Sequence, residues 1–446
     1  MLRGPLLRNI VFYTIPIILT SVLQLLFMAA DLVVVGRYCG SISVAAVGAT
    51  NALTALIVNL FMGLSIGAGV TVAHSIGGHR DEETHRIVHT SLPTAAIGGF
   101  VLAVIGITFC KQLLIMMGTP ETVLPLSASY MKIFFAGMPF AMVYNFCASI
   151  LRAAGDTKSP LIFLSLAGGI NVLLNLLFVT VFQMNVAGVA LATIISQGIS
   201  AVLMIIVLMR RTDACKLYLS KMHIYKQQLL KIIRIGLPAG IQGSIFSISN
   251  VIIQSSVNSF GDIFMSGNAS AQSIEAFVYV TINSFQQTAV NFVGQNVGAN
   301  QYDRVSKISK ICLASVAITG IVVGGTTFFF GPSLLSIYIT DSPEAIAYGI
   351  MRMTFVCLPY FLCGLMDVST GLLRGLGASV APMIISILGV CGIRIMWIFT
   401  IFQMPEYHSP QSLYASYPIS WTLTFLVQLV VFIFIYRKQA NESALN

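Results

Sequence analysis

Residues 149–160 read SILRAAGDTKSP, and residues 370–382 read TGLLRGLGASVAP. The two stretches place Arg152 in register with Arg374 and Pro160 with Pro382. Three more pairs fall into register at the same shift of about 221 residues: Pro16 with Pro238, HSIGGHRDE at 74–82 with QNVGANQYD at 295–303, and VFQM at 181–184 with IFQM at 401–404. Because these pairs keep one order at one offset, we predict that the chain consists of two similar halves.

The composition indicates that lipid surrounds most of the chain. Of the 446 residues, 57% are hydrophobic and only 9% are charged, whereas soluble domains carry about 25% charged residues. A soluble fold of this length cannot hide so much apolar surface, because a large share of any folded surface stays exposed. A helix that crosses the hydrocarbon needs about 20 mostly apolar residues, and the sequence supplies such runs between short polar breaks.

We therefore expect an all-α polytopic membrane protein with about twelve transmembrane helices. The predicted spans are 10–35, 46–74, 88–110, 123–149, 160–182, 187–209, 231–258, 266–297, 307–330, 345–371, 382–403 and 415–436. Each half holds six spans, an even number, so the two six-helix lobes share one orientation. They are then related by a pseudo-two-fold axis along the membrane normal, a symmetry found among transporters, and the binding site is expected between them near the membrane middle.

The basic residues predict how the chain is oriented. If the N-terminus is cytoplasmic, 19 of the 24 Lys and Arg residues fall in inward segments, and only Arg37 and Lys111 fall in outward loops. Under the positive-inside rule both termini are cytoplasmic. Because the basic residues lie between apolar runs, they also argue against a nucleic-acid partner, which needs a basic patch on a folded domain.

The predicted domains are an N-terminal six-helix lobe (1–209), a basic cytoplasmic linker (210–230), a C-terminal six-helix lobe (231–436) and a cytoplasmic tail (437–446). The linker alternates basic, aromatic and aliphatic residues. This pattern suits either a segment that lies along the anionic inner leaflet or a solvated connection. No cleavable signal peptide is evident, because the first apolar run is too long for one.

The sequence offers no motif for catalysis or for a bound cofactor. The eight cysteines are scattered, form no CxxC pair and are interpreted as small hydrophobic residues. His74, His79, His85 and His89 fall in a segment interpreted as a solvated inward loop, not a metal site. A phosphate-binding G-x-x-x-x-G-K-[ST] motif and a nucleophile elbow are both absent. We expect that the protein is not an enzyme and has no cofactor.

A first candidate site surrounds the acid of the first span. Charged residues inside a membrane are costly and mark candidate functional sites. Asp31 is either an interfacial acid or a carboxylate that exchanges protons or binds a cation. Asn171 and Asn175 project from one helix face, and Thr193 adds a hydroxyl. This oxygen set suits Na⁺ or a protonatable acid held in a hydrogen-bond network, although Asn pairs also join helices.

A second candidate site follows from a polar stripe. In the eighth predicted span, polar residues recur every four positions: Glu275, Tyr279, Asn283, Gln287, Asn291 and Gln295. The seventh span adds Asn250 and Gln254. Such a stripe cannot face lipid, so it either lines a water-filled cavity or forms buried hydrogen bonds between helices. We predict a substrate cavity, with Glu275 suited to pairing with a cationic substrate. Asp367 either lines this cavity or forms an ion pair with Arg394.

With these residues in view, the chain resembles the multidrug and toxic compound extrusion (MATE) family from about residue 5 to 436. The stretches that carry the resemblance are AADLVVVGRYCG at 29–40, ILRAAGDTKSP at 150–160, NVLLNLLF at 171–178, AGVALAT at 187–193, QSIEAF at 272–277, FVGQNVGAN at 292–300 and GLLRGLGAS at 371–379. Their order and their duplication are specific to the family, although no single motif decides it.

The resemblance implies two six-helix lobes around a V-shaped cavity, and export of organic cations or drugs driven by Na⁺ or H⁺. By position, Asp31 matches the first-helix acid tied to cation coupling in the family. Asn171, Asn175 and Thr193 fall where members of the family complete that site. Glu275 matches the eighth-helix acid implicated in transport.

The sequence also departs from parts of the family. Some members have Asp where this chain has Asn175, which removes one charge. The norfloxacin-exporter branch carries a seventh-helix glutamate, whereas the matching stretch here, GSIFSIS at 243–249, has none. Asp367 lies about one turn from the tenth-helix acid of that branch. These differences leave a second-lobe cation site of that type unsupported.

We expect a secondary active antiporter that exports organic, cationic compounds in exchange for Na⁺ or H⁺. It would act as a monomer in the inner membrane of a bacterium, with small organic substrates and the lipid bilayer as its partners. The alternative is a lipid-linked oligosaccharide or lipid flippase of a related superfamily, which needs several basic residues in its cavity. The clear intramembrane charges are three acids and Arg394, which favours the antiporter.

Overall fold

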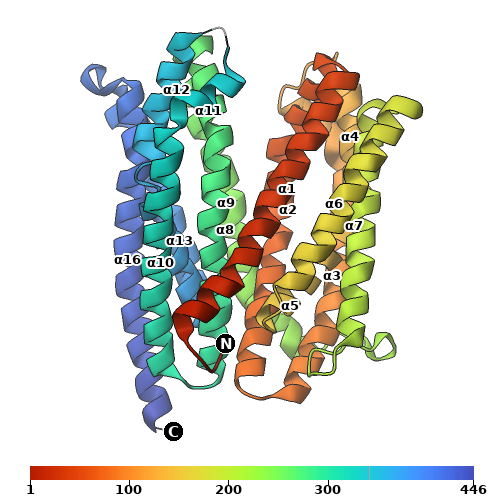
Figure 1. Cartoon of the computed structure of the whole chain (residues 1–446), viewed down its shortest axis with the longest axis vertical. Helices are drawn as coiled ribbons and strands as arrows, with labels where there is room; N and C mark the ends of the chain where they lie inside the picture. Colours follow the sequence, from red (N-terminus) through yellow and green to blue (C-terminus); the bar gives the residue numbers. More distant parts are fainter. Residues whose placement is uncertain (341, 446) are drawn as a thin grey trace. The chain divides into compact units, whose positions relative to one another are not determined.

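The structure is a computed structural model that describes residues 1–340 and 342–445, without the side chain of Ala52. The first half contains α1 (Leu6–Tyr38), α2 (Ser41–Gly77), α3 (Asp81–Met116), α4 (Leu124–Ala136), α5 (Met138–Ala153), α6 (Lys158–Leu176), the π-helix η1 (Leu177–Val181) and α7 (Asn185–Arg210). The second half contains α8 (Lys226–Asn258), α9 (Asp262–Gly298), α10 (Tyr302–Phe329), α11 (Gly331–Tyr338), α12 (Pro343–Val356), α13 (Tyr360–Gly375), α14 (Val380–Ser386), the π-helix η3 (Ile387–Gly392), α15 (Ile393–Phe399) and α16 (Pro410–Leu445) (Figure 1). Short 3₁₀ turns occupy Leu219–Lys221, Ile401–Gln403 and Pro405–Tyr407.

Most of these helices are long and apolar enough to cross a membrane. Within the described residues, nine helices meet this condition, and two bent pairs raise the number to eleven. The bent pairs are α4 with α5, at 48°, and α12 with α13, at 46°. The remaining predicted span, 266–297, falls within α9, whose 37 residues are long enough to cross but carry the polar stripe. The predicted all-α polytopic fold is confirmed.

The duplication appears again in the backbone geometry. Left-handed φ angles, which favour Gly and are tolerated by Asn and His, occur at matching turns: Gly40 and Gly261, His79 and Asn300, and Gly155 and Gly377. The turns after α5 and α13 also close alike. The Gly155 N–H donates to the Arg152 carbonyl, and the Gly377 N–H donates to the Arg374 carbonyl, each at 2.9 Å. The two halves therefore share their turns as well as their helices.

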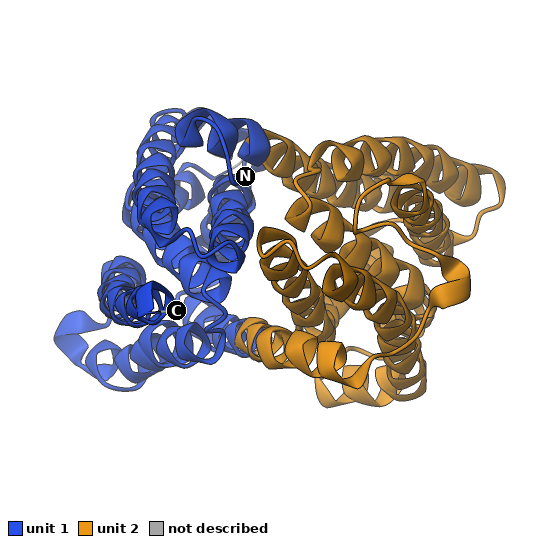
Figure 2. Cartoon of the chain, turned by 90° about the horizontal axis from the view of Figure 1, so that it is seen from below, with its two compact units in different colours: residues 1–14, 245–446 blue, residues 15–244 orange. Residues whose placement is uncertain are grey.

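The chain divides into two compact units (Figure 2): residues 1–14 and 245–446 form unit 1, and residues 15–244 form unit 2. This division differs from the predicted lobes, 1–209 and 231–436, because α1 and α8 each begin in one unit and end in the other.

Local packing explains where these two helices begin. In unit 1, the hydroxyls of Thr14 and Thr288 are 2.8 Å apart, so the first turns of α1 lie against α9. In unit 2, the first turns of α8 lie against α2. A Cβ added at Gly236 would come within 2.6 Å of the Leu64 Cα, so these helices approach closely because Gly236 has no side chain. Small residues allow such contact between membrane helices.

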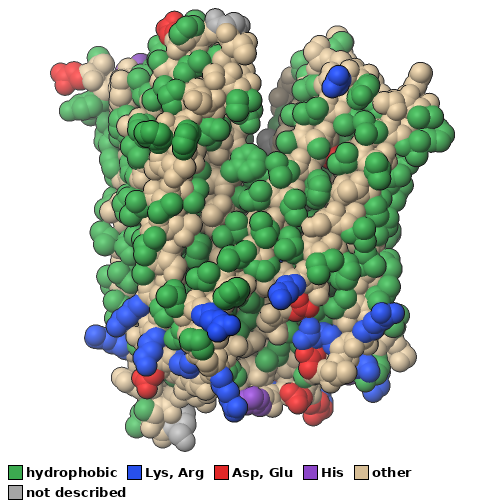
Figure 3. Space-filling view, viewed as in Figure 1, with side chains coloured by type: hydrophobic (Ala, Val, Ile, Leu, Met, Phe, Trp, Pro, Cys, Tyr) green, Lys and Arg blue, Asp and Glu red, His purple; other side chains and the backbone are tan. Residues whose placement is uncertain are grey.

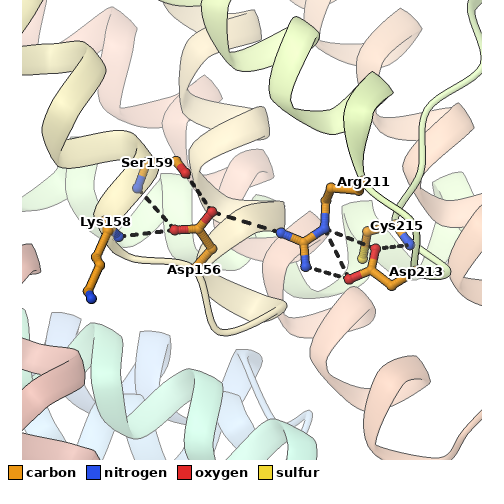
Figure 4. A network of polar contacts seen from close by, with 6 residues as sticks. All are labelled: Asp156, Lys158, Ser159, Arg211, Asp213 and Cys215. Atoms are coloured by element: carbon orange, nitrogen blue, oxygen red, sulfur yellow. Dashed lines mark hydrogen bonds and ion pairs between the residues drawn. The ribbon is translucent and has the colours of Figure 1, made fainter.

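The linker after α7 is anchored to unit 2 by a polar network (Figure 4). Arg211 forms an ion pair with Asp213 and lies 3.9 Å from Asp156, which in turn accepts the Ser159 N–H at the start of α6. The Asp213 carboxylate accepts the Cys215 N–H at 3.1 Å. Cys215 and Leu217 are buried, while Leu219 and Met222 are exposed. The linker is therefore docked on protein along one side, which neither predicted alternative described.

The histidine segment differs from the solvated loop predicted for it. α3 already begins at Asp81, so His85 and His89 lie on a helix. His89 is fully buried, its Nδ1 lies 2.7 Å from the His85 carbonyl, and its Nε2 accepts the Tyr218 N–H at 3.0 Å. His89 therefore holds the linker and is not solvated. The interpretation as a solvated loop was wrong because the helix begins before these residues and the linker covers them.

Exposed apolar side chains show which surface lipid covers. Phe12, Phe100, Ile318 and Phe434 are between 64% and 70% exposed, although each lies within a membrane-length helix. A soluble monomer rarely exposes apolar surface on this scale. In Figure 3 hydrophobic side chains cover the length of the helices, and Lys and Arg gather toward one end of the helices in each unit. The chain is a multi-pass membrane protein.

Candidate functional site

The first candidate site lies in unit 2, where α1, α6 and α7 meet. The amide nitrogen of Asn175 donates to Asp31 Oδ1 and also to Asn171 Oδ1, the latter at 3.1 Å. The amide nitrogen of Asn171 lies 3.4 Å from Thr193 Oγ1. The structure thus brings together the four residues that the sequence singled out for a cation-coupling site.

One acceptor in this cluster has no partner. Asn175 is fully buried, and its Oδ1 has no hydrogen bond with any described residue. A buried acceptor without a partner costs free energy, and such atoms usually receive a proton donor or an ion. Asp31 is half-buried, so the cluster is reachable from outside the protein. The arrangement suits a small cation or a proton.

Local sequence features hold this cluster in place. Gly168 leaves room on α6 for the ring of Phe27 from α1, because a Cβ at Gly168 would overlap that ring. Directly after Asn175, the helix changes to the π-helix η1, and such turns often occur at functional sites. Asn185 adopts a left-handed φ of 53° and accepts a hydrogen bond from Ser43 at 2.8 Å, which joins the start of α7 to α2.

The second candidate site is a cavity of about 290 Å³ within unit 1. It is lined by residues of α8, α9, α12, α13, η3, α15 and α16, and these include the predicted residues Asn250, Gln254, Glu275, Tyr279 and Asp367. The polar stripe therefore follows a cavity wall over its first turns. Because unit 1 alone forms this cavity, it is distinct from the site that we expected between the halves.

Two predicted cavity residues lie outside the lining. Asn283 donates to Gln286 at 2.8 Å and lies 3.5 Å from an Asp367 oxygen, so it supports the cavity wall from behind. Gln287 is one turn further along α9, and its backbone carbonyl accepts a hydrogen bond from Asn291 at 3.0 Å. Asn283 and Asn291 thus bond within α9, and Asn283 also reaches Asp367 on α13, so bonding between helices, the other predicted alternative, occurs at that contact.

Glu275 is paired within the protein. Arg352 donates to Glu275 Oε2 from Nη2 at 2.6 Å and from Nε at 3.0 Å, and Tyr360 donates to Oε1 at 3.2 Å. Asn268 accepts from the remaining Arg352 nitrogen at 2.8 Å. Glu275 was predicted to suit a cationic substrate, and Arg352 was not recognised as its partner. The sequence contained a signal for this pair, since Arg352 is a charged residue inside the predicted span 345–371.

Asp367 and Arg394 line the cavity separately. No ion pair joins them in the described residues, so the structure supports the cavity alternative for Asp367. Arg394 is 5% exposed, its Nε donates to Ser420 at 2.9 Å, and its guanidinium lies 4.0 Å from the centre of the Tyr417 ring. Beside the Glu275–Arg352 pair, the cavity thus presents the Asp367 carboxylate and the Arg394 guanidinium from different helices.

Comparisons with known proteins agree with these observations. A sequence model of the MatE family matches residues 16–177 and matches again at residues 238–400, which confirms the predicted duplication. Probable multidrug resistance protein YoeA of Bacillus subtilis (strain 168) is 27% identical, over 97% of this chain and 94% of its own length. Multidrug export protein MepA of Staphylococcus aureus (strain NCTC 8325 / PS 47) is 21% identical, over 86% of this chain and 85% of its own length.

The fold has solved counterparts. A crystal structure of MATE in the bent conformation superposes with a TM-score of 0.91 at 20% identity, and the superposition covers 99% of this chain and 98% of that one. An outward-facing multidrug resistance MATE family transporter of the MOP superfamily gives a TM-score of 0.90. Because the family model covers more than half of the sequence in two matching segments, the chain belongs to the MATE family of membrane transporters.

Proposed function

We propose that this protein is a secondary active multidrug exporter, which moves amphiphilic organic compounds out of a bacterial cell in exchange for H⁺ or Na⁺. The observation that carries the proposal is the cluster of Asp31, Asn171, Asn175 and Thr193. In it the Asp31 carboxylate accepts from the Asn175 amide nitrogen, and the oxygen of the same amide has no partner among the described residues. Curated relatives that carry the names of multidrug resistance and export proteins support the export of drugs.

The cluster suits cation coupling because the net charge at Asp31 changes when a cation or proton binds there. A cation or proton at Asp31 neutralises the carboxylate, which makes its burial less costly. In the present arrangement the Asn175 amide nitrogen faces Asp31. A proton on Asp31 is compatible with this arrangement, whereas Na⁺ needs the amide turned so that Oδ1 faces the carboxylate. The two ions therefore require different orientations of one side chain.

The cavity in unit 1 supports organic substrates of mixed character. Phe246, Tyr360, Tyr417 and Trp421 supply aromatic surface, and Asp367 supplies a carboxylate for a cationic group. Arg352 also lines the cavity, but Glu275 already neutralises it. Among the described residues, Arg394 is then the one lining arginine without a carboxylate partner, and a lipid diphosphate needs more positive charge than one residue provides. These observations favour a drug exporter over a lipid-linked oligosaccharide flippase.

We also propose that both termini are cytoplasmic, in the inner membrane of a bacterium. Support comes from the excess of Lys and Arg in alternate loops. The Arg304 side chain donates to the Met1 carbonyl at 3.1 Å, and the Tyr436 hydroxyl donates to the Tyr302 carbonyl at 3.1 Å. Met1 and the last turns of α16 therefore lie beside the start of α10.

The test is efflux of a cationic dye from proteoliposomes that contain the purified protein, under separate Na⁺ and H⁺ gradients. We expect one gradient to drive efflux and Asp31→Asn to abolish it, because a neutral amide can neither release a proton nor pair with a cation. Asn175→Asp adds a second carboxylate beside the first, and we expect it to change the ion dependence of transport.

Glu121→Gln is the matched control, because Glu121 is an exposed acid between α3 and α4. It should transport like the wild type. Efflux that runs equally well with Asp31→Asn would remove the coupling role of that residue. If folded wild-type protein moves no cationic dye under either gradient, drug export is the wrong assignment.

A further inference from the structure

The wall of the cavity in unit 1 contains a buried arginine whose charge no acid neutralises. Arg394 is 5% exposed, and no salt bridge joins it to a carboxylate of any described residue. Charged side chains buried in membrane proteins are normally paired, because an isolated charge in a medium of low dielectric constant is costly. The missing partner is therefore a feature that needs an explanation.

The surroundings of Arg394 fix its guanidinium and leave hydrogen-bonding capacity unused. The Nε–H donates to Ser420 Oγ at 2.9 Å, and the Tyr417 ring lies 4.0 Å from the guanidinium carbon. The Trp421 ring lies further away, at 5.6 Å. Nη2 is buried and has no hydrogen-bond partner in the described part of the chain. A guanidinium held in this way is preorganised for a planar acceptor, because its terminal N–H groups form a rigid fork.

A second polar group of the cavity wall is only weakly satisfied. Ser249 of α8 is 3% exposed and lines the cavity, and among the described residues its Oγ interacts with the Cys391 thiol but has no oxygen or nitrogen partner. A serine hydroxyl donates readily to an anionic oxygen. Two buried polar groups in one cavity, from different helices, thus keep hydrogen-bonding capacity for an occupant of the cavity.

The duplication places this arginine within the second-half counterpart of the helices that build the Asp31 cluster, although not on the helix equivalent to that of Asp31. The Asp31 cluster is built from α1, α6 and α7, the first, fifth and sixth spans of its half. Their counterparts in the second half are α8, the α14–η3–α15 segment and α16. These three elements supply Ser249, Arg394 and Tyr417 to the cavity. The same set of three elements therefore holds a carboxylate on its first span in one half and a guanidinium on its fifth span in the other.

The remaining charges of the cavity do not cancel this guanidinium. Glu275 is neutralised by Arg352 at 2.6 Å. Asp367 accepts a long hydrogen bond from Asn283 at 3.5 Å and lies on α13, on a different element from Arg394. An occupant that bridges the cavity would thus meet a positive group at one place and a negative group at another.

We propose that Arg394, with Ser249, forms a subsite for the carboxylate of aromatic substrates, whose ring lies against Tyr417 and Trp421. The subsite extends the range of compounds from cations to aromatic carboxylates, including zwitterions whose amine reaches Asp367. Export of the bound compound rests on the proposed function. Binding itself depends on the cavity alone.

The test compares two probes of equal size by isothermal titration calorimetry on the purified full-length protein. The probes are 2-naphthoate and 2-naphthamide, which differ in charge but share the ring. We expect the carboxylate to bind about ten- to a hundredfold more tightly, the range of a charge-assisted hydrogen bond to a buried arginine. Arg394→Gln should lower the affinity for the carboxylate to that for the amide and leave the amide unchanged, and Arg394→Lys should recover part of the difference.

Arg437→Gln is the control, because it removes an exposed arginine outside the cavity and should leave both affinities unchanged. Equal binding of the two probes by the wild type overturns the subsite, and this comparison needs no variant to fold. Unchanged discrimination in Arg394→Gln also overturns it. Discrimination that is lost in Arg394→Gln, partly regained in Arg394→Lys and kept in Arg437→Gln supports it. Dye efflux under an ion gradient is scored separately, so a chain that binds naphthoate but exports nothing retains the subsite and loses the proposed function.

Discussion

Arg352 and Glu275 form a buried ion pair in which two guanidinium nitrogens share one carboxylate oxygen, at 2.6 and 3.0 Å. The two residues are 77 positions apart, on α12 and α9, and Tyr360 and Asn268 complete their hydrogen bonds. This pair removes the net charge of the most conspicuous acid in the cavity. It changes the role of Glu275 from a ligand for substrate to a structural partner of Arg352.

Glu275→Gln is expected to destabilise the protein by about 3–5 kcal/mol, because it leaves the Arg352 charge buried without compensation. The double variant Glu275→Leu with Arg352→Met removes both charges and should recover most of the loss. The measurement is the thermal unfolding midpoint in detergent. Asp262→Asn, at an exposed helix start, is the control. A Glu275→Gln protein that unfolds at the wild-type temperature but no longer binds cations would return Glu275 to the substrate site.

The close contact of α2 with α8 gives a second prediction. Gly236→Ala places a methyl group 2.6 Å from the Leu64 Cα and 2.7 Å from the Gly63 carbonyl oxygen. Backbone atoms cannot move aside as a side chain can, so we expect a loss of about 1–3 kcal/mol. Gly169→Ala in α6 is the matched control, since nothing lies within 4 Å of its added Cβ.

Gly169→Ala should be neutral or slightly stabilising, because Ala is the better helix former. The measurement is the thermal unfolding midpoint of Gly236→Ala, Gly169→Ala and the wild type. Equal midpoints for the two alanine variants would mean that α8 is free to shift away from α2. The small residues would then not be what holds the start of α8 in unit 2.

Much of the fold was predictable because lipid imposes simple rules on a sequence. Apolar runs of sufficient length must be helices that cross the membrane, and the offset of about 221 residues already paired turns such as those at Gly155 and Gly377. The bends between α4 and α5 and between α12 and α13 were not predicted. Each was included in one continuous apolar span, because hydropathy does not register a change of helix direction.

The candidate sites were predictable to different degrees. The Asp31 cluster was found because polar residues in a membrane are few, and Asn171 and Asn175 share a helix face. The Glu275 pair was missed because its partner is distant in sequence, and no local pattern shows which acid meets which arginine. His89 was misassigned for a similar reason, since only the docked linker reveals that Tyr218 reaches its ring.

The docked linker predicts a protected thiol. Cys215 is 1% exposed, and burial raises its pKa to about 12. In a variant whose other seven cysteines are replaced by serine, Cys215 should react slowly with a maleimide at pH 8. Arg211→Ala removes the anchor to Asp213 and Asp156, and we expect labelling to become at least about tenfold faster as the thiol is exposed. Arg210→Ala, an exposed neighbour, should label like its parent. Equal rates for the two arginine variants would show that burial of Leu217 and the His89 contact suffice to hold the linker.

The same anchor should depend on pH in a definite direction. The hydrogen bond from Arg211 lowers the pKa of Asp213 below its ordinary value, which is about 3.9. A depressed carboxyl pKa contributes stability that is present above the ordinary value and is lost as the pH falls through the lower, folded value. The docked linker should therefore persist from neutral pH down to about pH 4 and loosen only below it.

Pepsin cleavage within residues 211–225 measures this loosening, and the ratio of the Asp213→Asn rate to the wild-type rate at each pH cancels the pH dependence of the protease. We expect a ratio well above one at pH 5, because the amide has lost the ion pair that the wild type retains. The ratio should approach one only when the pH falls below the lowered pKa of Asp213, where the wild-type carboxyl is protonated as well. A ratio of one at pH 5 would exclude Asp213 as an anchor, and a ratio that stays high at the lowest pH would mean that the carboxyl holds the linker without its charge.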